Sequence, residues 1–258
     1  MISRKDAKAQ SFIYFLLLVS AILICSSAFA AKPNVLLISI DTLRADHLGC
    51  YGYSKKTPAI DSLASRSVLF ENTISQVPLT LPSHCTIFTG MYPDQHGVRN
   101  NENFVLAQNS VTIAELFRQS GYSTGAVVGS FSLDSTFQVN QGFQYYEDKI
   151  GVSHDPELNR HVERRAETVW KLGKQWLQNQ KGPWFCFLHF FDPHFGYNPP
   201  TGYPQTYDGE IGYTDKVIAD ILQFLKGSNY YSTTIVVLLS DHGEALGDHG
   251  EENHGVFL

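Results

Sequence analysis

The stretch that decides the fold is NVLLISI, residues 34–40, a continuous apolar run that leads directly into Asp41. An uninterrupted run of this length is typical of a strand buried on both faces of a parallel sheet. Two later stretches have the same character, WFCFLHFF at residues 184–191 and TTIVVLL at residues 233–239, and a shorter strand is expected at residues 124–128. These stretches predict several buried strands in one sheet.

Segments with helical character alternate with these strands. Helices are expected at residues 111–120, 157–180 and 210–226, and another begins at Thr57-Pro58, a pair typical of an N-cap and a first helical position. Strands that alternate with helices in this way predict an α/β sandwich with a largely parallel central sheet.

The first thirty residues are typical of a secretory signal peptide. Basic residues occur among positions 4–8, residues 12–25 are apolar, and Ala28-Phe29-Ala30 is a small-x-small cleavage site. The alternative is an uncleaved membrane anchor. The apolar run is shorter than the roughly 20 residues that a spanning helix prefers, which disfavours this alternative. We therefore expect a periplasmic or secreted protein, cleaved after Ala30, with no membrane span in its mature part.

The composition of the remaining chain excludes some classes of protein. Removing the three basic residues and one acidic residue of positions 1–30 leaves 16 basic and 24 acidic residues, a net charge of −8. A nucleic-acid-binding protein needs a basic face, so that class is disfavoured. The three cysteines that remain, Cys50, Cys85 and Cys186, are too few for a disulfide framework. Residues 31–258 suffice for one large catalytic domain, which we expect to be truncated at its C-terminus because the chain stops directly after an apparent functional motif.

Two of the predicted strands run into acidic residues. Asp41 follows the first strand, and Asp241-His242 follows the last. Ligands of open α/β sheets bind beyond the carboxyl ends of the strands, so two carboxylates and an imidazole at one edge make a candidate site for a divalent metal ion. The alternative is that each aspartate caps the next element in an ordinary turn.

A hydroxyl group is expected at the beginning of another helix. In the segment PLTLPSHCTIFTG, residues 78–90, Pro82 suits the first turn of a helix and Gly90 its end, which places Thr80 at the N-terminus. Free amides and the helix dipole favour an anion there, and a hydroxyl beside a metal ion can act as a nucleophile. The alternative is that Thr80 serves only as an N-cap.

Four blocks of the chain together resemble the sulfatase-like family of the alkaline phosphatase superfamily. They are NVLLISIDTLRADHLGCYGY, PLTLPSHCTIFTGMYPDQHGV, FLHFFDPHFGYNPP, and VVLLSDHGE with a later HG, and they occur in family order between residues 34 and 255. The resemblance implies a three-layer α/β/α sandwich and an enzyme that hydrolyses esters with the help of a metal ion.

The resemblance also assigns roles to single residues. Three residues stand at the positions of family metal ligands: Asp41, Asp241 and His242. Thr80 stands where the family keeps its nucleophile, which also contacts the metal. His194 stands where relatives keep a histidine that contacts the transferred group or the leaving oxygen, and His254 stands near a Lys or His that faces the anion. Asn101 is a further candidate for substrate binding, although a turn explains it as well.

The chain departs from the family pattern at several of these positions. Sulfatases begin a Cys-x-Pro-Ser-Arg motif with a Cys or Ser that is oxidised to formylglycine, whereas residues 80–84 are Thr-Leu-Pro-Ser-His. Oxidation of a threonine gives a ketone, so formylglycine cannot form. Residues 129–132 lack the Lys and His that sulfatases direct at the sulfate. Thr42 replaces a second aspartate and His242 replaces an asparagine, which favours Zn²⁺ or Mn²⁺ over Ca²⁺.

These departures favour an enzyme that acts on phosphate or phosphonate esters through Thr80. One divalent ion (Zn²⁺, Mn²⁺ or Ca²⁺) is expected, although His189, Asp192 and His254 can supply part of a second ligand set. The alternatives are a sulfatase without formylglycine, a transferase that passes a phospho-group to an envelope glycan or lipid, and an inactive metal-stabilised binding module. The substrate is expected to be a small molecule or a glycan or lipid ester.

Overall fold

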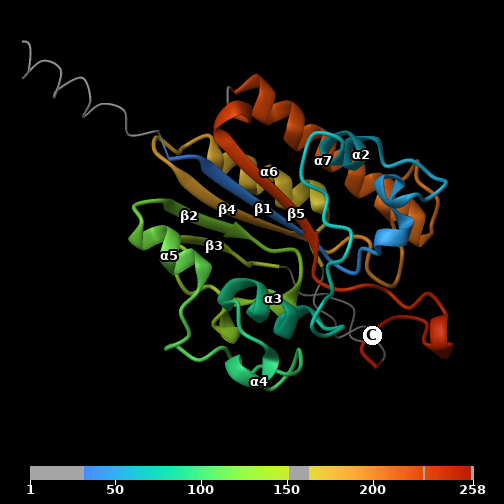
Figure 1. The fold of residues 1–258 in the computed structure, drawn as a ribbon, viewed down its shortest axis with the longest axis horizontal. Coiled ribbons are helices and arrows are strands. Elements are labelled where there is room, and N and C mark those ends of the chain that lie inside the picture. Colours follow the sequence, from blue (N-terminus) through green and yellow to red (C-terminus); the bar gives the residue numbers. More distant parts are fainter. Residues whose placement is uncertain (1–31, 151–162, 229, 257–258) are drawn as a thin grey trace, which may run out of the picture. The chain divides into compact units, whose positions relative to one another are not determined.

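A parallel sheet forms the middle of the structure. The computed structural model describes residues 32–150, 163–228 and 230–256. The strands are β1 (Asn34–Ile40), β2 (Ser123–Val127), β3 (Tyr145–Glu147), β4 (Trp184–Phe190) and β5 (Thr234–Ser240). Their order is β3-β2-β4-β1-β5, and every neighbouring pair is parallel. Figure 1 shows β1 between β4 and β5, with helices on both sides of the sheet.

The helices divide into two layers because β1 and β4 are apolar on both faces. The helices are α2 (Pro58–Ala64), α3 (Thr80–Thr89), α4 (Pro93–His96), α5 (Ile113–Gln119), α6 (Ala166–Leu177) and α7 (Tyr207–Gly227). Leu36, Ile38 and Ile40 belong to the core that α2, α6 and α7 cover. Leu37 and Phe187 belong to the core on the other face, which α3 and α5 cover. The predicted three-layer α/β/α sandwich is therefore confirmed.

The strand predictions agree with the structure to within one residue at each end, but the burial of β5 differs from the prediction. Among the described residues β5 is an edge strand, with β1 as its neighbour. Its side chains alternate between partly buried and exposed, and those of Ile235 and Val237 are exposed. The apolar composition of β5 gave no sign of this, because the order of strands in a sheet is set by contacts distant in the sequence.

The long helix predicted at residues 157–180 begins later than expected. Residues 157–162 lie outside the described residues, and α6 starts at Ala166. The Arg164 guanidinium donates to the carbonyl oxygens of Val128 and Glu147, which ties residue 164 to the ends of β2 and β3. The Ala166 amide donates to the Asp192 carboxylate at 2.9 Å and so starts the helix there.

Two expectations concern parts of the chain for which the structure gives limited information. The predicted signal peptide at residues 1–30 lies outside the described residues, so export of the protein stays a prediction. Within the described ranges, no helix is both long and apolar enough to cross a membrane. Cys50, Cys85 and Cys186 are all free thiols.

Candidate active site

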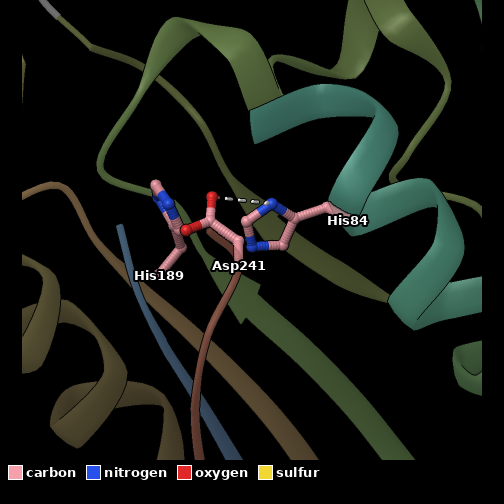
Figure 2. A group of neighbouring side chains, drawn as sticks. All are labelled: His84, His189 and Asp241. Carbon is pink, nitrogen blue, oxygen red and sulfur yellow. Dashed lines mark ion pairs between the residues drawn. The ribbon is translucent and has the colours of Figure 1, made fainter. Parts of the chain in front are cut away.

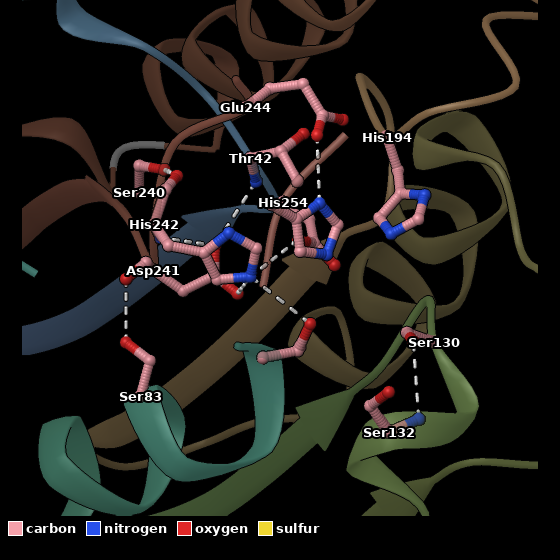
Figure 3. Close-up of polar contacts among 12 residues, drawn as sticks. Thr42, Ser83, Ser130, Ser132, His194, Ser240, Asp241, His242, Glu244 and His254 are labelled. Carbon is pink, nitrogen blue, oxygen red and sulfur yellow. Dashed lines mark hydrogen bonds and ion pairs between the residues drawn. The ribbon is translucent and has the colours of Figure 1, made fainter. Parts of the chain in front are cut away.

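The carboxyl ends of β1 and β5 bring two aspartates together. Asp41 follows β1, Asp241 follows β5, and the two strands pair in register up to Ile40 and Ser240. Asp41, Asp241 and His242 are buried, and each offers a ligand atom within 4.8 Å of the others. Figure 3 shows Asp241 and His242 at this edge of the sheet. The structure thus brings together the three metal ligands that the sequence predicted.

Three of the four carboxylate oxygens at this edge lack a hydrogen-bond donor. Both oxygens of Asp41 and Oδ2 of Asp241 are buried without a partner, whereas Asp241 Oδ1 accepts from the amides of Thr42 (3.3 Å) and His242 (2.9 Å). Burial raises the pKa of Asp241 to about 6, and the charge of Asp41 adds to that effect. Burial acts in the same direction on Asp41, but its contact with His189 and the charges of His242 and His194 lower its pKa overall. Buried carboxylates without donors are the kind of group that a cation stabilises.

The position of His242 fits a metal ligand. Its Nδ1 donates to the Gly243 carbonyl at 3.0 Å, so the lone pair of the neutral ring lies on Nε2. This atom lies 3.5 Å from Asp41 Oδ1, 3.6 Å from Asp241 Oδ2 and 3.4 Å from Thr80 Oγ1. Two ligands that each lie about 2.1 Å from zinc at a tetrahedral angle are roughly 3.4 Å apart. The residues present therefore fit a divalent ion.

Thr80 is the first residue of α3, as the sequence predicted, and it does not serve as the N-cap. Leu79 is the N-cap residue, and its side chain makes no capping hydrogen bond. The Leu81 amide donates to Asn101 Oδ1 at 2.8 Å, and Pro82 has no amide hydrogen. The helix N-terminus therefore offers an anion fewer free amides than expected. Asn101 keeps only its amide NH₂ group for a substrate, and its role in binding stays a prediction.

His84, at the position of the sulfatase arginine, holds the backbone of Thr80 through a hydrogen bond. The ring is fully buried, and burial together with the neighbouring His189 lowers its pKa to about 3, so it is neutral. Its Nδ1 donates to the Thr80 carbonyl at 2.7 Å, and its Nε2 accepts from the Ser39 hydroxyl at 2.9 Å. Because His84 carries no charge, it cannot replace the arginine as a cation.

Two further histidines face the site from the loops after β4 and β5. His194 stacks on Phe191, with ring centroids 4.2 Å apart, and its centroid lies 4.9 Å from that of His254. The ring of His254 lies 4.6 Å from that of His242, so the predicted catalytic and substrate-binding histidines gather beside the metal ligands (Figure 3).

Glu244 is the one residue of this group that the sequence analysis missed. Its side chain is fully buried; Oε1 accepts from His254 Nδ1 at 2.9 Å, and Oε2 accepts from the Phe195 amide at 3.0 Å. Burial lowers the pKa of His254, but the hydrogen bond to Glu244 together with the charges of Glu244, Asp41 and Asp241 raises it overall. The acidic residue in the Asp-His-Gly-Glu sequence was the available signal, although its partners are set by distant loops.

Comparison with known proteins identifies the family to which this fold and site belong. The family model described as Sulfatase matches residues 33–256, which is nearly all of the chain. The chain belongs to the Sulfatase family. The blocks that carried the resemblance, and the site that they form at the sheet edge, are thus features of a Sulfatase-family domain.

Curated members of the Sulfatase family align over much of the chain. An ulvan-active sulfatase of Formosa agariphila is 28% identical over 84% of the chain and 51% of its own length. A Δ4,5-hexuronate-2-O-sulfatase of Bacteroides thetaiotaomicron is 32% identical over 66% of the chain and 37% of its own length. The chain thus spans 51% and 37% of the length of these two relatives.

A solved structure shares the fold. The phosphonate monoester hydrolase of Agrobacterium radiobacter superposes with a TM-score of 0.73 at 20% identity, covering 88% of this chain and 66% of that one. At this level of identity the likeness shows the fold alone.

Proposed function

We propose that this Sulfatase-family protein hydrolyses phosphate or phosphonate esters at a divalent metal site, with Thr80 as the covalent nucleophile. The observation that carries the proposal is the position of the Thr80 hydroxyl. It lies 3.4 Å from His242 Nε2, beside buried Asp41 and Asp241 oxygens that have no hydrogen-bond donor. A Thr in this place supports direct attack by a hydroxyl oxygen, because it cannot be converted to formylglycine.

The reaction begins with the deprotonation of Thr80. A divalent ion held by Asp41, Asp241 and His242 would supply the positive charge that lowers the pKa of the hydroxyl. The proton leaves to solvent, and Thr80 Oγ1 attacks phosphorus, forming the Oγ1–P bond while the bond to the leaving oxygen breaks. Water then attacks the phosphorus, and the Oγ1–P bond breaks to restore Thr80.

The two loop histidines handle the charge and the proton of the substrate. His194 Nδ1 donates to the Phe195 carbonyl at 3.2 Å, which leaves Nε2 facing the substrate. In the imidazolium form Nε2 carries the second proton and gives it to the departing oxygen, and the ring becomes neutral. His254 is bound to Glu244 through Nδ1, and its raised pKa favours a cationic ring whose Nε2 donates to an anionic substrate oxygen.

Sulfate esters are the second candidate substrates. Curated relatives are named as sulfatases of ulvan and of a hexuronate, which favours a sulfated glycan as substrate. Transfer of a phospho-group to an envelope glycan or lipid, and a metal-stabilised binding module without activity, are the remaining alternatives. Export to the periplasm or the medium, predicted from residues 1–30, is part of the proposal because it fits an extracellular glycan or lipid ester.

The test uses the full chain loaded with Zn²⁺ and four nitrophenyl or phenyl substrates: a phosphate monoester, a phosphate diester, a phosphonate monoester and an aryl sulfate. We expect turnover of a phosphorus ester, and we expect Thr80→Ala to lower kcat by about 10³-fold or more. Thr80→Ser keeps a hydroxyl and should retain much of the activity. Thr89→Ala is the matched control, because Thr89 lies on the same helix and its hydroxyl donates to the Cys85 carbonyl and accepts from the Met91 amide.

The outcomes separate the candidates. Turnover of the aryl sulfate alone would replace the phosphorus ester by a sulfate ester. Product that forms only after addition of an acceptor alcohol would identify a transferase. Activity that survives in Thr80→Ala would contradict the role of Thr80, and absence of turnover with every substrate would favour the binding module.

A further inference from the structure

His189 is a buried side chain whose position the proposed reaction does not explain. It lies next to the end of β4, opposite Ser39 of β1, and its side chain is fully buried. Neither ring nitrogen has a hydrogen-bond partner. Leaving a buried polar group unpaired costs about 1–3 kcal/mol, and such groups in folded proteins usually have an unseen partner such as a water molecule or an ion.

The charged atom beside His189 is Oδ2 of Asp41. The first metal site uses the other oxygen of this carboxylate, Oδ1. His189 Nε2 lies 3.5 Å from Asp41 Oδ2, while His242 Nε2 lies 3.5 Å from Asp41 Oδ1. A separation of 3.5 Å is too long for a good hydrogen bond. The separation of 3.5 Å matches the spacing of roughly 3.4 Å between two ligands of one tetrahedral zinc ion. Each oxygen of Asp41 therefore lies at the distance from one imidazole that two ligands of the same ion would have.

Asp241 is close to the same place. Figure 2 shows its carboxylate between the rings of His84 and His189, and these three residues each offer a ligand atom within 4.8 Å of the others. His84 is not available as a ligand, because its Nδ1 donates to the Thr80 carbonyl and its Nε2 accepts from Ser39. Asp241 Oδ2, in contrast, is buried without a partner.

We infer that His189 Nε2, Asp41 Oδ2 and Asp241 form a second divalent cation site that shares both carboxylates with the first. The inference rests on the first site of the proposed function, in which His242 binds the other side of the same two carboxylates. Carboxylates shared in this way hold two ions roughly 3.5–4 Å apart. Two histidines, one from the end of β4 and one from the loop after β5, then flank a pair of aspartates.

The charges at the site suggest how the second ion depends on the substrate. One divalent ion balances the two aspartates, and a second leaves an excess of positive charge in a buried place. A dianionic phosphate or sulfate group bound beside Thr80 can balance that excess. The second ion is therefore expected to bind when an anion is present.

The test counts the ions directly rather than through activity. The full chain, free of metal, is dialysed against Zn²⁺ in a buffer that contains sulfate, and bound zinc per chain is measured by mass spectrometry. We expect two ions per chain, and one in His189→Gln, with affinity for the second ion at least about tenfold weaker. His189→Phe tests the same loss without a polar group, and His96→Gln is the control. His96 is another buried histidine, and its Nε2 bonds the Thr86 hydroxyl in α3.

A second measurement checks that the two ions are neighbours. When Mn²⁺ is used as the probe, two ions that share carboxylates give an exchange-coupled electron paramagnetic resonance spectrum. His189→Gln should give the spectrum of an isolated Mn²⁺. Circular dichroism and thermal unfolding establish that both His189 variants are folded; if neither folds, the coupled Mn²⁺ spectrum of the unaltered protein decides.

The results distinguish failure of this inference from failure of the proposed function. One ion per chain in the unaltered protein, with an uncoupled Mn²⁺ spectrum, overturns the second site and leaves the first intact. The same count in the unaltered protein and in His189→Gln also overturns it. Absence of any bound ion overturns both the second site and the metal site of the proposed function.

Discussion

Asp215 and Asp241 are both buried aspartates, but their surroundings differ in a way that separates structure from function. Asp215 lies in α7 and accepts hydrogen bonds from the amides of Ala59 (3.1 Å) and Ile60 (2.9 Å) in the first turn of α2. Asp241 accepts from two amides through Oδ1, while its Oδ2 lies 3.6 Å from His242 Nε2 and has no donor. The first carboxylate completes a helix end, and the second is satisfied only by something that the chain does not supply.

The same difference predicts opposite effects of mutation. Burial raises the pKa of both side chains, and at Asp215 the bonds from Ile60 and Ala59 oppose that effect. Removing the Asp215 carboxylate should destabilise the protein under all conditions. Removing the charge of Asp241 should stabilise the metal-free protein and weaken metal binding.

Asp241→Asn should have the largest effect. Asparagine keeps Oδ1 as an acceptor for the Thr42 and His242 amides but removes an anionic metal ligand, so Zn²⁺ affinity should fall by about 100-fold or more. In metal-free protein the free energy of unfolding should rise by about 1–2 kcal/mol at neutral pH. Isothermal titration with Zn²⁺ and urea unfolding of the metal-free protein measure the two quantities.

The pH dependence of the Asp241→Asn effect follows from the raised pKa, about 6, of that carboxyl group. A raised carboxyl pKa destabilises the folded state when the group is ionised. The advantage of Asn over Asp should therefore be full above about pH 6 and should disappear as the pH falls toward about 4, the value of an exposed aspartate. An Asn variant that is less stable than the unaltered protein without metal would break the comparison.

Asp215→Ala should have the next largest effect, with a different signature. The Ala59 and Ile60 amides lose their acceptor at the start of α2, so we expect a loss of about 2–3 kcal/mol in the free energy of unfolding. The loss should be the same with and without Zn²⁺, and the Zn²⁺ affinity should not change.

Asp220→Ala is the matched control for Asp215→Ala. Asp220 lies on the same helix, is about half-exposed and pairs with Lys216 at the surface, so its loss should cost no more than about 0.5 kcal/mol. Urea unfolding measures the loss of stability in Asp215→Ala and in Asp220→Ala. A change in Zn²⁺ affinity in Asp215→Ala would show that the carboxylates of Asp215 and Asp241 are not independent.

The part of the site that could be predicted from the sequence depends on local patterns. Asp41 and Asp241 each follow an apolar strand, and parallel strands place their carboxyl ends at one edge whatever their order. Thr80 could be placed at a helix N-terminus because Pro82 and Gly90 mark the two ends of that helix.

The rest depends on contacts between segments far apart in the sequence. The carboxylate beside His189 belongs to Asp41, which follows the neighbouring strand, and the pairing of β4 with β1 is not visible in either strand alone. Glu244 bridges His254 and the Phe195 amide from two other loops. The late start of α6 depends on Asp192 in the same way.

Glu210 is expected to show the smallest effect, because its hydrogen bonding is intermediate between that of Asp215 and that of Asp241. Its Oε1 accepts from the Asn198 amide at 2.8 Å, yet burial and the nearby Asp192 raise its pKa to about 7. Because an exposed glutamate has a pKa near 4.5, the folded protein should lose stability as the pH rises from about 4.5 to 7.

Glu210→Gln keeps an acceptor for Asn198 and removes this dependence. We expect the variant to match the unaltered protein near pH 4.5 and to be more stable by about 1–2 kcal/mol at pH 8, a value reduced for partial solvent screening. Urea unfolding across this range measures the difference. If the difference stays constant with pH, the single amide bond is enough to stabilise the Glu210 carboxylate, and Glu210 resembles Asp215 in this respect. If it grows with pH, one donor is not enough for a buried carboxylate, and the case for a cation beside Asp241, which lacks any donor at Oδ2, becomes stronger.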